Sequence, residues 1–190
     1  LAFAVVMTGF IYPMEGSWTW GGQSVFGLFS LGDDFGFSDF AGSGIVHMAG
    51  AFAALAAVII IGPRDGKYDK NGKPKNIPGS NMPLVAIGTL ILWLGWFFFN
   101  GGSLLAFSTI ADANALGKIF VNTNSAAALG AISALIICRI LWKKADLTMI
   151  LNGALAGLVA ITADPLSPSL GGAALIGLLA GGLVVFSILR

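Results

Sequence analysis

Long apolar stretches alternate with short polar ones along this chain. Six apolar segments stand out, at residues 1 to about 13, 40–61, 82–107, 121–142, 147–163 and 171–189. Most of them approach the roughly 20 residues that a helix needs to cross a bilayer. Because lipid cannot satisfy the backbone amides of an open strand, the segments are predicted to be transmembrane helices. The pattern therefore predicts an all-α, polytopic helical bundle within one transmembrane domain, residues 1–190.

Composition agrees with a location in the cell membrane. Of the 190 residues, 56% are hydrophobic and only 10% are charged, whereas roughly a quarter of the residues of a soluble domain are charged. The net charge of +1 provides no basic field for nucleic acid. The single cysteine, Cys138, offers neither a disulfide nor a metal pair. We expect no cofactor, and we interpret the chain as an internal fragment that begins and ends beside apolar spans.

The charged residues predict the orientation of the spans. When the spans alternate in direction, only Lys118 among the ten basic residues falls on the outer side. The other nine mark the cytoplasmic side, where loops retain Lys and Arg; they are Arg64, Lys67, Lys70, Lys73, Lys75, Arg139, Lys143, Lys144 and Arg190. Six acidic residues fall outside, namely Glu15, Asp33, Asp34, Asp39, Asp112 and Asp164. An acidic outer face suits a cationic substrate.

His47 and Asp39 are the ionisable residues most closely tied to an apolar span. His47 is the only histidine and lies well inside the second apolar segment. It is either a packing residue that is hydrogen-bonded to a neighbouring carbonyl or a residue that lines an aqueous path. The second role is favoured, because ionisable side chains inside a bilayer usually face such a path. Asp39 comes just before the same segment, where a carboxylate accepts from free helix amides. Capping is the stronger prediction for Asp39, and its charge also lowers the energy of an arriving cation.

Aromatic and hydroxyl side chains gather at the outer ends of two spans. Trp20 is either an interfacial anchor or a π face for a cation. Phe99 and Ser103 are four residues apart and therefore share one helix face. Phe99 either packs or forms a gate, and Ser103 either bonds to its own helix or accepts a hydrogen bond from a substrate.

Several motifs resemble the ammonium transporter (Amt/Mep/Rh) family in order and spacing. They are Trp20-Gly21-Gly22, Asp39-Phe40-Ala41-Gly42-Ser43-Gly44-Ile45-Val46-His47, Gly62-Pro63-Arg64, Leu94-Gly95-Trp96-Phe97-Phe98-Phe99-Asn100-Gly101-Gly102-Ser103 and Val121-Asn122-Thr123. The resemblance extends over essentially the whole chain. It implies the fourth to ninth helices of an eleven-helix fold that is built from two inverted repeats.

The resemblance also implies roles for individual residues. Trp20 and Ser103 would form an outer recruitment site, Phe99 one ring of a gate, and His47 the first of two pore histidines, while Asp39 would support the outer vestibule. The implied function is transport of ammonium, deprotonated at the outer site and conducted as ammonia, by a homotrimer that a small PII-type signalling protein regulates. The second pore histidine and the first gate phenylalanine are expected outside this sequence. Residues 162–168 depart from the family's pattern of small residues and cysteine.

Other functions find weaker support in the residues. An integral-membrane enzyme using His47 and Asp39 lacks a metal-ligand pair, a Gly-x-Ser-x-Gly elbow and a phosphate loop. A cation channel lacks a carbonyl filter of the Thr-Val-Gly-Tyr-Gly type. An ammonium sensor with the same fold, in contrast, carries the same motifs as a transporter. The sequence therefore predicts ammonium transport, with sensing as the alternative.

Overall fold

The computed structural model describes residues 1–75, 77 and 79–189, and helices account for all of its long elements. In chain order they are α1 (Ala2–Val6), η1 (Met7–Ile11), α2 (Tyr12–Ser17), α3 (Leu31–Phe35), η2 (Ser43–Met48), α4 (Ala49–Ile61), α5 (Met82–Gly102), α6 (Ile110–Trp142), α7 (Leu147–Ile161) and α8 (Leu170–Leu189). The first three follow one another without a break, as do η2 and α4, where η denotes a turn of π-helix. The all-α prediction is confirmed.

Four helical stretches in the described part of the chain have the length and apolarity to cross a membrane. They are Ser43–Ile61, Met82–Gly102, Ile110–Trp142 and Leu170–Leu189. Helix α7 is also apolar but has only 15 residues. Each of the six apolar segments expected from the sequence thus contains helix, although only four of these helices have full membrane length.

The beginning of α6 differs from the sequence prediction. The predicted apolar segment began at 121, but the helix already begins at Ile110 and includes the polar residues at 112–118. The Thr109 hydroxyl accepts from the Asp112 amide at 3.1 Å, and the Asp112 carboxylate accepts from the Thr109 amide at 2.9 Å. This reciprocal capping box satisfies amides at the helix start. The polar residues that resembled a link are therefore the first turns of a 33-residue helix.

The preceding helix ends earlier than its apolar segment does. Apolar residues continue to 107, but α5 stops at Gly102 and Leu105 has a positive φ of 56°. A left-handed residue cannot continue a right-handed helix. The connection to α6 therefore starts directly after Ser103, which places this hydroxyl at the end of α5.

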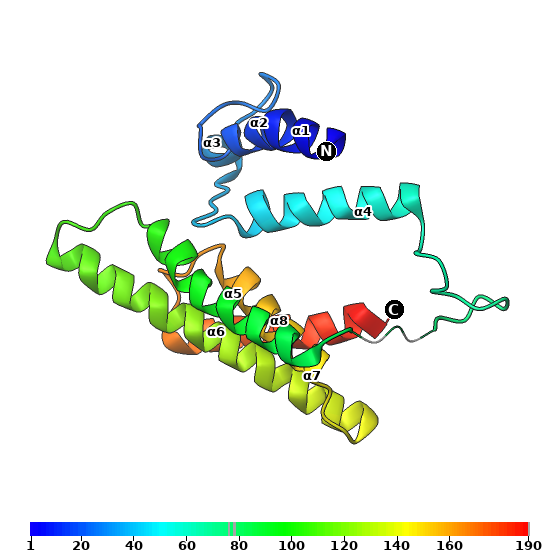
Figure 1. Cartoon of the computed structure of the whole chain (residues 1–190). Coiled ribbons are helices and arrows are strands. Elements are labelled where there is room, and N and C mark those ends of the chain that lie inside the picture. Colours follow the sequence, from blue (N-terminus) through cyan, green and yellow to red (C-terminus); the bar gives the residue numbers. More distant parts are fainter. Residues whose placement is uncertain (76, 78, 190) are drawn as a thin grey trace.

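Helices α6, α7 and α8 pack tightly against one another and form the densest part of the structure (Figure 1). Small residues make this approach possible, because a side chain at the crossing points would meet backbone. A Cβ on Gly153 of α7 would lie 2.5 Å from the carbonyl oxygen of Gly130 in α6, and one on Gly181 of α8 would lie 2.7 Å from the Gly130 Cα. Gly130 is thus the point where the three helices meet.

The N-terminal helices lie apart from this bundle. In Figure 1, α1–α3 and α4 lie above α5–α8, and the polar loop after α4 extends to the side before it returns to α5. Two backbone hydrogen bonds join the halves: the Phe40 amide donates to Ala163 at 2.8 Å and the Ala41 amide donates to Thr162 at 3.1 Å. The segment before η2 is therefore anchored to the C-terminal end of α7.

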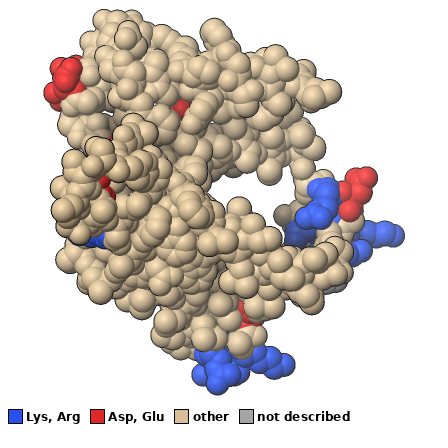
Figure 2. Space-filling view, turned by 60° about the vertical axis from the view of Figure 1, so that its left-hand side comes forward, with Lys and Arg blue, Asp and Glu red and all other residues tan. Residues whose placement is uncertain are grey.

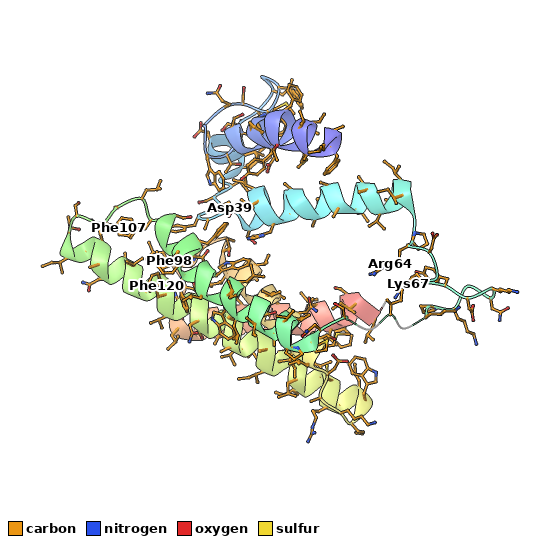
Figure 3. All side chains as sticks on the ribbon, viewed as in Figure 1. Asp39, Arg64, Lys67, Phe98, Phe107 and Phe120 are labelled. Carbon is orange, nitrogen blue, oxygen red and sulfur yellow. The ribbon has the colours of Figure 1, made fainter. Side chains whose placement is uncertain are left out.

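Charged side chains gather in a few places on the surface, and large uncharged areas lie between them (Figure 2). Asp39 lies near the start of the η2–α4 helix, whereas Arg64 and Lys67 lie beyond its other end (Figure 3). This separation agrees with the orientation predicted from the basic residues, of which Arg190 lies outside the described residues. The polar loop also includes positions 76 and 78, which likewise lie outside them.

Candidate functional site

Asp39 caps the helix that carries His47. Its side chain is only 5% exposed. One carboxylate oxygen, Oδ1, accepts from the amides of Gly42 and Ser43, and Oδ2 accepts from those of Gly44 and Ile45, all at 2.8–2.9 Å. A helix leaves its first four amides without partners, and here one carboxylate satisfies four of them. The capping prediction for Asp39 is confirmed.

The ring of His47 lies against two aromatic rings of α5. The His47 and Trp96 rings are stacked, with centroids 5.0 Å apart and planes inclined by 19°. The Phe99 centroid is 5.7 Å from that of His47. His47 Nε2 is buried and has no hydrogen-bond partner within the described residues. The ring is thus held by aromatic contacts, and one of its nitrogens is left for another partner.

Trp96 itself is held by the threonine that follows the last residue of α7. Its Nε1 donates to the Thr162 hydroxyl oxygen at 2.7 Å, and this hydroxyl donates to the carbonyl of Leu158 at 2.6 Å. Thr162 is 0% exposed. Sequence reasoning did not single out Trp96 or Thr162 as site residues. Trp96 lies three residues before Phe99 and therefore on the same helix face, which is a signal in the sequence, whereas nothing local pointed to Thr162.

Trp20 and Ser103 line the same cavity, although Trp20 follows α2 and Ser103 follows α5. The cavity has a volume of about 410 Å³ and is also lined by Phe40 and Leu105. Trp20 is 50% exposed, so that part of its ring is accessible from this side. The Ser103 hydroxyl donates to the Phe99 carbonyl at 2.9 Å. The hydroxyl oxygen keeps lone pairs with which it can accept a hydrogen bond.

Trp20 is tied to the segment that Asp39 caps. Its indole Nε1 donates to the backbone carbonyl of Asp39 at 2.8 Å. Gly42 has a positive φ of 105°, and a Cβ at this position would lie 3.2 Å from the Trp20 ring and clash with Val46. Glycine is therefore favoured at position 42 for two reasons: the backbone is left-handed there, and the Trp20 indole lies close to it.

The five residues predicted from the sequence thus lie in one connected region. Trp20 and Ser103 line the outer cavity, Phe99 follows one helical turn from Ser103, and His47 contacts Phe99. Asp39 supports the helix start beside them. No cluster of three His, Cys, Asp or Glu residues suited to a metal ion is found in the described ranges. The arrangement places one hydroxyl, several aromatic rings and a buried imidazole next to one another.

Comparisons with known proteins agree on one family. The family model described as "Ammonium Transporter Family" matches residues 1–189. Ammonium transporter Amt2 of Archaeoglobus fulgidus is 49% identical over 167 residues, which are 86% of this chain and 35% of that protein. The solved structure "Sensor Amt Protein" has a TM-score of 0.83 at 41% identity and covers 94% of this chain and 43% of its own. The crystal structure of Candida albicans Mep2 has a TM-score of 0.81 at 29% identity. The match covers 98% of this chain and 39% of the Mep2 chain.

These similarities bear on the alternatives considered above. The chain is an integral membrane segment, and the family that it matches is a transporter family and not an enzyme family. The chain spans about a third of the length of the curated relative from Archaeoglobus fulgidus. The fold and the family are therefore settled.

Proposed function

The chain belongs to the ammonium transporter family, and we propose that the full-length protein carries ammonium or ammonia across the membrane along a route past Trp20, Ser103, Phe99 and His47. One observation carries this proposal. Trp20 and Ser103 line one cavity, Phe99 lies one helical turn before Ser103, and its ring is 5.7 Å from that of His47, whose buried Nε2 has no partner in the described part of the chain. A polar solute that passes the aromatic rings would meet this nitrogen first.

Recruitment of the cation is assigned to Trp20 and Ser103. The face of an indole attracts a cation, and the contribution is about 0.5–1 kcal/mol at an exposed site and about 2 kcal/mol when the site is desolvated. The Ser103 oxygen accepts a hydrogen bond from one N–H of ammonium while its own O–H still donates to the Phe99 carbonyl. Potassium carries the same charge but has no N–H groups, so it cannot form this directional hydrogen bond.

Deprotonation separates ammonium from other cations more strongly. On insertion scales a charge at the centre of a membrane helix costs about 2.5–3.5 kcal/mol. Ammonium avoids that cost when it transfers one proton to solvent water at the exposed Trp20 side of the cavity, because neutral ammonia can then pass the ring of Phe99. Potassium has no neutral form. The apolar walls around His47 therefore act as a filter against ions.

His47 guides the neutral solute. A neutral imidazole has one N–H donor and one bare nitrogen acceptor. Because Trp96 and Phe99 contact the ring, its position is defined without consuming Nε2. That nitrogen then exchanges hydrogen bonds with passing ammonia, which replaces part of the hydration that the solute leaves behind.

A His47→Ala variant of the full-length protein tests the route. We expect methylammonium uptake to fall at least roughly tenfold, or ammonium selectivity to be lost, because loss of a hydrogen-bond partner in an apolar pore costs about 1–3 kcal/mol. Met48→Ala is the matched control, since the neighbouring Met48 side chain is 54% exposed. Normal, selective uptake by a correctly assembled His47→Ala protein would contradict the pore assignment.

Sensing is the second candidate function. It is favoured by the likeness to the structure named "Sensor Amt Protein", whose identity of 41% exceeds that of Candida albicans Mep2. Uptake of labelled methylammonium by the wild type distinguishes the two functions. Saturable binding without flux would indicate a sensor.

Two partners belong to the same proposal. We assign a homotrimer of the full-length protein as the working assembly. Cross-linking in native membranes tests this assignment, because it should yield a species of three subunits. In the loop from 63 to 81, the described residues 63–75 project away from the helices in Figure 1 and include Arg64 and Lys67 (Figure 3). This loop is assigned as the docking site of a small PII-type signalling protein, and a pull-down that recovers no such protein would exclude it.

A further inference from the structure

The stacking of Trp96 on His47 depends on what satisfies the indole N–H. An indole has a single donor and no acceptor, and leaving this donor unpaired in an apolar interior is costly. The partner is the Thr162 hydroxyl, 2.7 Å away and 66 positions later in the sequence. The direction in which the Trp96 ring can point is therefore limited by the C-cap residue of α7.

Thr162 is itself fixed in orientation. Its hydroxyl proton is directed to the Leu158 carbonyl at 2.6 Å, so that a lone pair remains to accept from Trp96. Its backbone oxygen accepts from the Ala41 amide at 3.1 Å. The side chain is fully buried. One residue thus contacts both the Trp96 indole and the backbone that leads into the helix of His47.

The position of His47 follows from these two contacts. The Ala41 bond sets the start of its helix, and the Thr162–Trp96 bond sets the ring against which it stacks at 5.0 Å. No side-chain hydrogen bond holds Nε2 within the described residues. A shift of the Trp96 ring would therefore change the place at which Nε2 meets a solute.

We propose that Thr162 is a positioning residue for conduction, which holds the Trp96 indole and through it the His47 ring. This inference rests on the proposed transport function. Thr162 does not touch the outer cavity lined by Trp20 and Ser103. Its hydroxyl consequently governs the rate at which captured solute passes and leaves the capture step unchanged.

Replacement of the hydroxyl in the full-length protein tests this role. Thr162→Val keeps the shape and removes the acceptor, and we expect the maximal rate of methylammonium uptake to fall roughly tenfold with an unchanged half-saturating concentration. Thr162→Ser keeps the hydroxyl and restores the rate. Thr89→Val is the matched control, because Thr89 is also buried and its hydroxyl bonds only to Val85 of its own helix.

A double variant distinguishes the hydrogen bond from general packing. Trp96→Phe removes the donor, and its combination with Thr162→Val should be no slower than the slower single variant, since both remove the same bond. The proposal is overturned if Thr162→Val takes up methylammonium at the wild-type rate, or if Thr162→Val and Thr162→Ser lose the same fraction of the rate. It is also overturned if the losses of rate in Trp96→Phe and Thr162→Val add fully in the double variant. If Thr162→Val does not assemble, Trp96→Phe alone decides, because an unchanged rate in that variant also overturns it.

A spectroscopic measurement keeps this proposal separate from transport. In protein labelled with ¹⁵N-tryptophan, the Trp96 indole signal is identified by its loss in Trp96→Phe. We expect the signal to shift in Thr162→Val and to stay in place in Thr162→Ser and Thr89→Val. An unmoved signal in Thr162→Val refutes the hydrogen bond, whereas a wild type without uptake but with the expected shift refutes only the transport function.

Discussion

The indole Nε1 of Trp20 donates a hydrogen bond to the backbone carbonyl of Asp39 at 2.8 Å, across 19 positions of sequence. The same Asp39 caps the helix of His47 with its carboxylate. The aromatic ring at the outer cavity and the start of the histidine helix are therefore joined through one residue. A change at Trp20 is expected to affect both solute capture and the geometry of the mouth.

Substitutions at the outer cavity are expected to weaken capture. Trp20→Leu removes the π face and the bond to Asp39, and the half-saturating concentration for methylammonium should rise roughly fivefold or more, since a partly exposed cation–π contact contributes about 1 kcal/mol. Ser103→Ala should raise it as well. Trp18→Leu serves as the control, because Trp18 packs on Phe26 and does not line the cavity. An unchanged concentration dependence in both site variants would remove the capture site.

Loss of the Asp39 cap should destabilise the His47 helix. Asp39→Ala leaves four amides without their carboxylate, and we expect a loss of at least about 2 kcal/mol, because a single cap contributes about 1 kcal/mol and charged hydrogen bonds contribute more. Thermal unfolding in detergent measures the change. Asp33→Asn, an exposed acidic residue of α3, should unfold as the wild type does. Equal melting of the wild type and Asp39→Ala would show that the cap is dispensable.

A methyl group at the crossing of α6 and α8 should force the helices apart. A Cβ on Gly181 would lie 2.7 Å from the backbone Cα of Gly130, and backbone cannot rotate away as a side chain can. We expect Gly181→Ala to cost about 1–3 kcal/mol, the usual range for overpacking. Gly117→Ala on α6, where nothing lies within 4 Å, should be neutral or stabilising by up to about 1 kcal/mol. The melting temperatures of Gly181→Ala and Gly117→Ala measure the difference. Equal values would show that α6 and α8 do not pack closely enough at Gly181 to exclude a methyl group.

Stability should fall with acidification through the cap of α7. The Thr148 hydroxyl and then the Met149 amide donate to the Asp146 carboxylate and lower its pKa below the ordinary 3.8. A carboxylate with a lowered folded-state pKa stabilises the protein above 3.8 and loses this contribution as pH falls through the folded-state pKa. Asp146→Asn should therefore flatten the pH dependence of unfolding below about pH 4. An identical acid dependence in wild type and variant would exclude Asp146 as a contributor.

Local patterns in the sequence determined much of this protein. Runs of apolar residues predicted the helices, since lipid permits few other structures, and the position of Asp39 before such a run predicted a cap that the coordinates contain. Spacing alone placed Ser103 one turn after Phe99. Residues 112–118 show the limit of this reasoning, because polar residues in the first turns of a capped helix look like a loop.

Contacts between distant segments were decided only by the tertiary structure. Trp20 and Ser103 meet at one cavity, and Trp96 meets Thr162 across 66 positions. No local pattern encodes such pairs, because they depend on how α7 is placed beside α5, and glycine contacts such as Gly130 with Gly153 set the packing of α7 on α6. Trp20 and Ser103 were thus readable from the chain as individual candidates, while their meeting at one cavity and the contact of Thr162 with Trp96 required the packing of segments far apart in sequence.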